Sequence, residues 1–115
     1  MKFMVSLITD GTGMEGTTPE QMADFARRMG EYMEELQNSG VLQHQGRLGP
    51  ASGARTVHRG KNAKPAVTDG PFAETKEQVA GYMVLECNDL DEAVDWAERL
   101  PVAGGAVEVR EIIDS

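Results

Sequence analysis

Apolar and polar residues along this chain follow two different periods. Short apolar runs, typical of β-strands, occur at residues 2–8, 41–48, 79–87 and 106–113. Two other segments, 19–38 and 90–100, place apolar residues three or four positions apart, which is the spacing of an α-helix. The pattern therefore predicts two strand-helix-strand units.

Both predicted helices have clear start signals. Thr18 is expected to cap the first helix, with Pro19 at the first helical position and Gln21 completing a capping box. Asp89 is the expected cap of the second helix, and Pro101 ends it. The first helix carries its predicted buried stripe at Met22, Phe25, Ala26, Met29, Met33 and Leu36.

A β-hairpin is predicted between the two units. Segments 54–59 and 64–69 alternate in polarity around the turn-prone residues 60–62, and we expect them to be edge strands. The resulting element order is a ferredoxin-like α+β fold with an inserted hairpin, in which both helices cover one face of the sheet. One domain spanning residues 1–115 is expected, because a chain of 12.5 kDa is too short for two cores.

The strongest predicted strand, 79–87, is apolar on both faces. Alternate residues point to opposite sides of a strand. One side holds Val79, Gly81, Met83, Leu85 and Cys87, and the other holds Ala80, Tyr82 and Val84. Two helices shield only one side, and a bare apolar sheet face is costly and prone to aggregation. The sequence therefore predicts a homodimer through the sheet faces, a dimeric α+β barrel.

Composition narrows the possible partners and the compartment. The net charge of -8 disfavours direct binding to nucleic acid, because an acidic surface repels phosphate. Cys87 is the only cysteine, so no intrachain disulfide forms and a reducing cytoplasm is expected. The first apolar run is too short to span a membrane, and no membrane association is expected.

No cofactor or metal is expected. His44, His58 and Cys87 lack the spacing of metal ligands. The loop at 10–16 contains Gly-x-Gly but lacks the lysine of a phosphate-binding loop and the third glycine of a dinucleotide fingerprint.

The run from Thr68 to Glu77, with Asp69, Gly70, Pro71 and Phe72 in succession, resembles the signature of the YciI-like (DGPF domain) family of small bacterial proteins. The resemblance also covers Val41-Leu42, Gly81-Tyr82, the second helix start at 89–93 with Trp96-Ala97, and residues 107–110. It implies a dimeric α+β barrel and, for this branch, a genetic context beside extracytoplasmic-function sigma factors.

Some relatives have a histidine on the first helix that is proposed to form a catalytic dyad with an aspartate. In this chain that helix position falls on Met29, so the resemblance implies that the dyad is absent here.

Asp69 and His44 are the candidate catalytic residues. Asp69 ends a strand beside Phe72, where a carboxylate can act as a general acid or base; its alternative role is to accept amide hydrogen bonds in the following turn. Strand alternation places His44 with Leu42 on an apolar face, where an imidazole near Asp69 would complete an acid-base pair. A structural histidine with a local partner is the alternative.

The candidate ligand-binding residues are Arg47, Gly70, Pro71, Phe72 and Glu74. Arg47 can hold a carboxylate bidentately or form a surface ion pair, and Phe72 can stack on a ligand or pack in the core or interface.

These candidate residues and the predicted dimer are compatible with two functions. The first is a cofactor-free enzyme acting on a small metabolite in a cleft between sheet, hairpin and partner. The second is a non-catalytic ligand-binding or regulatory dimer linked to a sigma-factor pathway.

Overall fold

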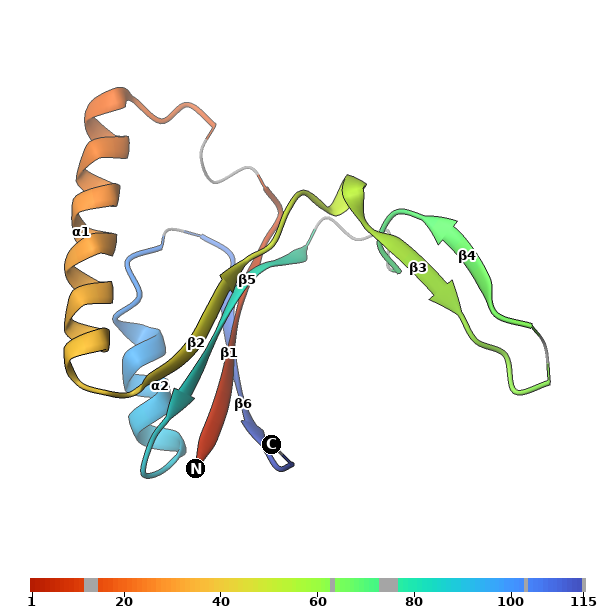
Figure 1. Ribbon diagram of the computed structural model, residues 1–115. Helices are drawn as coiled ribbons and strands as arrows, with labels where there is room; N and C mark the ends of the chain where they lie inside the picture. The colour runs from red at the N-terminus through yellow and green to blue at the C-terminus, as the bar shows by residue number, and fades with distance from the viewer. Residues whose placement is uncertain (12–14, 63, 73–76, 103, 115) are drawn as a thin grey trace.

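The first apolar run forms a central strand of an antiparallel sheet. In the computed structural model, β1 (Lys2–Thr9) lies between β5 (Gln78–Glu86) and β6 (Ala106–Ile112), and β2 (Leu42–Arg47) pairs with the other edge of β5 (Figure 1). The strand order β2-β5-β1-β6, antiparallel throughout, is that of a ferredoxin-like α+β fold, which confirms the fold predicted for the single chain.

The structure describes residues 1–11, 15–62, 64–72, 77–102 and 104–114.

Two helices, α1 (Pro19–Asn38) and α2 (Leu90–Glu98), lie on the same side of this sheet (Figure 1). The predicted capping box is present, because Thr18 Oγ1 accepts from the amide of Gln21 at 3.1 Å and Gln21 Oε1 accepts from the amide of Thr18 at 3.0 Å. Asp89 caps α2 as predicted. Within the described part of the chain, no helix is long and apolar enough to cross a membrane.

The core lies between the helices and one face of the sheet. Its buried members are Phe3, Val5, Tyr32, Leu36, Met83, Leu85, Cys87, Ala93 and Trp96. Tyr32 was not in the predicted stripe of the first helix, yet its ring packs edge-on against Trp96 at 6.0 Å and its hydroxyl donates to the carbonyl of Trp96 at 2.8 Å. Met22, by contrast, is 48% exposed and Ala26 is also exposed, so the prediction that these two residues are buried is wrong.

The inserted hairpin is present but does not join the main sheet. After the short 3₁₀ turn η1 (Ala51–Gly53), β3 (Arg55–His58) and β4 (Ala66–Asp69) pair with each other as a separate two-stranded sheet. Both are edge strands, as predicted, but they belong to their own sheet and not to the main one. Pro50 has no amide hydrogen with which to continue the β2 ladder, and η1 turns the chain away from β5.

Candidate ligand-binding site

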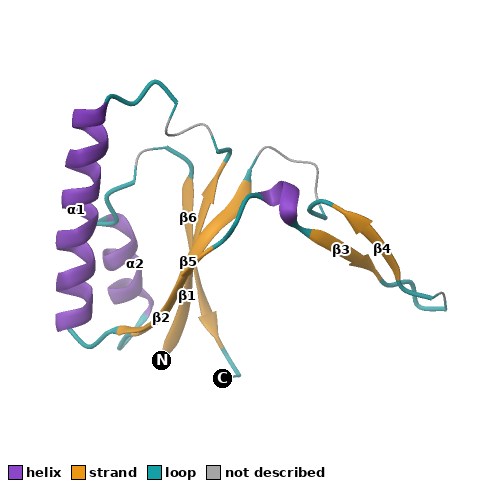
Figure 2. Ribbon diagram, turned by 45° about the horizontal axis from the view of Figure 1, so that its top comes forward, coloured by secondary structure: helices purple, strands orange, loops and turns teal. Residues whose placement is uncertain are grey.

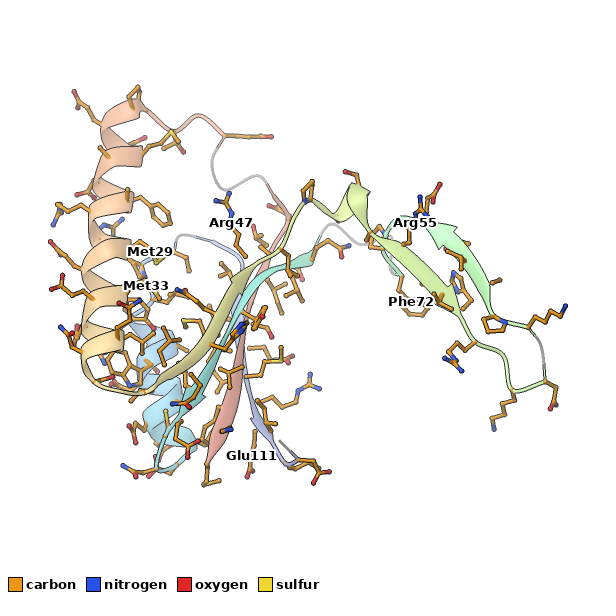
Figure 3. The ribbon with its side chains drawn as sticks, in the orientation of Figure 1. Met29, Met33, Arg47, Arg55, Phe72 and Glu111 are labelled. Carbon is orange, nitrogen blue, oxygen red and sulfur yellow. The ribbon has the colours of Figure 1, made fainter. Side chains whose placement is uncertain are left out.

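A cavity of about 890 Å³ lies between α1 and the sheet. Its apolar walls come from Val5, Leu7 and Met83 on the sheet side and from Met22, Phe25, Met29 and Met33 on α1. Figure 3 shows Met29 and Met33 pointing from α1 towards the sheet. The cavity is of the size that holds small organic ligands, and its mainly apolar walls are typical of such sites.

The difference in length between the helices explains why this space is hollow. The α1 helix has 20 residues and α2 has 9, so with about 1.5 Å per residue α1 extends well past the end of its neighbour. Near its carboxyl end, α1 packs Tyr32 and Leu36 into the core beside α2. Near its amino end it has no neighbouring helix, and Phe25 lies outside the core cluster. The space between the amino-terminal half of α1 and the sheet is therefore open.

Polar side chains enter the cavity from β2. Gln45 pairs with Met83 and Arg47 pairs with Gly81, both of which are buried on the helix side of the sheet. Directly paired residues share a face, so Gln45 and Arg47 occupy positions where a closed core would have apolar residues. Figure 3 shows Arg47 on the α1 side of the sheet. Sequence reasoning missed Gln45, although its alternation with Arg47 was visible.

Arg28, on α1, is the second cationic residue of the cavity lining. Its Nε donates a hydrogen bond to Asp24 Oδ2 at 3.1 Å, and this bond orients the guanidinium. Arg47 forms no ion pair with any described residue, so its charge is available to a ligand.

A smaller hollow of about 730 Å³ adjoins the base of the hairpin and shares Arg47 with the larger cavity. Asp10, Leu48 and Gln78 are among its lining residues. Arg47 therefore borders both hollows.

Asp69 lies away from this region, on the hairpin. Its side chain is 94% exposed and its Oδ1 is 3.7 Å from Arg55 Nε, an exposed ion pair of small energetic value. The following residue, Gly70, has φ of 94°, donates its amide to the carbonyl of Ala54 at 2.7 Å, and accepts from Thr56 Oγ1. Asp69 and Gly70 thus lie at the base of the hairpin, at the end opposite its turn.

The other residues of the DGPF run also lie on the hairpin side. Pro71 is half-buried, whereas Phe72 is 82% exposed, with its ring 6.1 Å from that of His58. Figure 3 shows Arg55 and Phe72 far from Arg47. Glu74 lies outside the described residues.

His44 does not share a face with Leu42, contrary to the sequence prediction. A β-bulge between these two residues shifts the register, so Leu42 pairs with Leu85 while His44 pairs with Val84 on the face without helices. His44 Nδ1 is 2.9 Å from the hydroxyl of Tyr82, and their rings stack at 5.5 Å. Within one protomer, His44 and Asp69 therefore lie on different elements with different partners.

Titratable side chains in the core do not reach the cavity. Burial is the main cause that raises the pKa of the Cys87 thiol to about 11, so this free cysteine is protonated and unreactive near neutral pH. Among the described residues, no group of three or more histidine, cysteine or acidic side chains is placed to hold a metal ion.

The fold and cavity define a small ferredoxin-like protein with a polar-edged pocket beneath its long helix. The family model of the YCII-related domain matches residues 1–115, and the chain belongs to this family. It is 40% identical over 92 residues to an uncharacterized protein, R00369, of Rhizobium meliloti (strain 1021), a match that covers 77% of this chain and 70% of the relative.

Among solved structures, 5-chloro-2-hydroxyhydroquinone dehydrochlorinase (TftG) from Burkholderia phenoliruptrix AC1100, in complex with 2,5-dihydroxybenzoquinone, aligns with 94% of this chain. The alignment covers 91% of that protein at 17% identity, with a TM-score of 0.46.

Proposed function

We propose that this protein binds a small organic acid in the cavity between α1 and the sheet. The observation that carries the proposal is Arg47, an arginine without an ion pair among the described residues, set into a mainly apolar hollow. Apolar walls favour the hydrocarbon part of a ligand, and a guanidinium favours a carboxylate. The ligand class is therefore an acid with an apolar, ring-sized or short-chain body.

Binding without catalysis is the role that we favour. Among the described residues that line the larger cavity there is no carboxylate and no imidazole, the usual general acids and bases. Met29, which occupies the position of the histidine found in some relatives, lines this cavity. The substitution removes an acid-base group from the lining and leaves a ligand-sized space, as expected of a ligand-sensing or regulatory member of the DGPF branch.

Calorimetric titration with acids and their neutral isosteres tests this proposal. We expect benzoate and octanoate to bind, and benzamide and octanamide to bind at least tenfold more weakly. Arg47→Gln should weaken acid binding by about 10- to 100-fold, because a hydrogen bond to a charged group contributes about 1.5–3 kcal/mol. Arg27→Gln, on the solvent side of α1, is the matched control. Equal affinity for acids and amides would refute the proposal.

A catalytic role is the second candidate, and Asp10 is the observation in its favour. This carboxylate lines the smaller hollow together with Arg47, so an acid held by Arg47 would lie near a potential general base. Proton NMR in D₂O tests it through exchange of the C–H protons next to the carboxylate of phenylacetate. Exchange that depends on the protein and disappears in Asp10→Asn, with binding retained, would establish this role.

We also propose that the functional unit is a homodimer formed through the sheet face without helices. Across this face, Arg110, Met4, Val84 and His44 form one row of directly paired residues. The centre of the row is apolar, Met4 is 40% exposed, and the edges are polar, which is the usual arrangement of an interface core and rim.

Sedimentation velocity tests the homodimer. Wild-type protein should sediment as a dimer, whereas Val84→Glu should be a folded monomer, because it places a carboxylate at the centre of the proposed interface. Ala23→Glu, exposed on α1, should leave the dimer intact. The one cysteine, free and buried, agrees with a proposed location in the reducing cytoplasm.

A further inference from the structure

The β3–β4 hairpin projects from the body and exposes apolar side chains. Val57 and Val67, which pair directly across the two strands, are 52% and 61% exposed, and Phe72 is 82% exposed. A lone two-stranded hairpin is only marginally stable in water, and an exposed apolar surface usually marks an interaction site. The hairpin is therefore expected to be covered by another surface.

The net charge of the hairpin indicates what kind of surface could cover it. Residues 54–72 contain four basic residues and one acidic residue, a net charge of +3, so the remainder of a chain of charge -8 carries -11. The basic residues are Arg55, Arg59, Lys61 and Lys64. The hairpin is thus electrostatically complementary to the body of another molecule of the same chain, and complementary potentials promote association.

The direction of the hairpin places that second molecule within reach. Figures 1 and 2 both show the hairpin on the opposite side of the sheet from α1 and α2. A partner that covers the sheet face without helices would occupy this same side. Face-to-face sheets pack about 10 Å apart, and a strand of four residues spans about 13 Å, so the hairpin is long enough to cross to the partner.

We propose that the β3–β4 hairpin is an arm that docks on a second copy of this chain, which outside its own hairpin is opposite in net charge. This inference rests on the proposed homodimer. The DGPF run then has a structural role, because Asp69 and Gly70 hold the base of the arm through Arg55, Ala54 and Thr56, and Phe72 becomes a contact with the partner.

Photo-crosslinking from the arm tests the proposal. The single native cysteine, Cys87, is buried and has a pKa raised to about 11, mainly by burial, so a maleimide-benzophenone reacts selectively with a thiol introduced by Val67→Cys. After irradiation, we expect a product of twice the chain mass on a denaturing gel. The same label at Asp95→Cys, exposed on α2, is the control and should give monomer only.

The outcomes separate this inference from the homodimer. If sedimentation shows a dimer but the Val67 label yields only monomeric products, the arm proposal is wrong while the dimer stands. If the protein sediments as a monomer and gives no crosslinked dimer, both are wrong.

A charge variant provides an independent readout. Replacing Arg59 and Lys61 together with glutamate should raise the dimer dissociation constant by about threefold to tenfold at low salt, since each exposed charge contributes little. The difference from wild type should shrink at high ionic strength, where exposed charges are screened. An unchanged dissociation constant at low salt would contradict docking of the basic arm on the acidic second chain. Circular dichroism checks that the variant is folded.

Discussion

The cavity beneath α1 can be tested by two alanine substitutions on the same helix. Leu36 is fully buried in the core, whereas Phe25 lines the cavity and lies outside the core cluster. Leu36→Ala creates a new void in packed surroundings, which costs about 3–5 kcal/mol in the free energy of unfolding. Phe25→Ala only enlarges a space that is already open.

The smaller cost of Phe25→Ala can be worked out from its surroundings. Its ring is partly buried, so its removal loses about 1.5 kcal/mol of apolar burial, and alanine returns about 0.5 kcal/mol through helix propensity. We expect a net loss near 1 kcal/mol, although phenylalanine is the larger side chain. Urea unfolding at one fixed protein concentration measures both variants, because the stability of the proposed dimer would depend on concentration. Equal losses for Phe25→Ala and Leu36→Ala would show that α1 packs on the sheet along its whole length, without a cavity.

Three further predictions concern the scaffold. Burial is the main cause that raises the pKa of Tyr32 from 10.0 to about 12, so this tyrosine ionises more readily in the unfolded chain. Through this group wild type should lose about 2 kcal/mol of stability between pH 10 and pH 12, and Tyr32→Phe should lose less. Gly105→Ala should cost more than about 2 kcal/mol by thermal unfolding, because a Cβ at its φ of 69° would collide with the carbonyl of Ile8, while Gly104→Ala, with open space, should cost about 1 kcal/mol. Thr18→Ala should cost about 1 kcal/mol and reduce amide-exchange protection in the first turn of α1, an effect that Thr18→Ser should not have.

Local signals in the sequence predicted the elements well. The bounds of α1 agree with the prediction at both ends, because Thr18, Pro19 and Gln21 define its start and Gly40, with φ of 76°, follows its end. Side-chain alternation also sorted the residues of β5 correctly into two faces, although it did not indicate which face the helices cover. These features depend on neighbours in sequence, which is why one chain is sufficient to predict them.

Features that depend on exceptions to regular spacing were not predicted. A single bulge moved His44 to the face opposite Leu42, and strand alternation alone contains no signal for that shift. Tyr32 fits the helical spacing between Met29 and Leu36, but its burial was not predicted. Its polar hydroxyl is buried because it donates a hydrogen bond to the carbonyl of Trp96, a residue far away in the sequence. The cavity itself depends on the unequal lengths of two helices that are far apart in sequence.

The proposed ligand-binding cavity and the proposed dimer interface lie on opposite faces of the sheet. The cavity that contains Arg47 lies on the helix side, whereas Val84 and the hairpin belong to the side proposed for the partner. A monomeric Val84→Glu variant should therefore still bind benzoate with Arg47-dependent affinity, because its cavity is built within one chain. If the folded monomer no longer binds the acid, the cavity is incomplete in a single protomer.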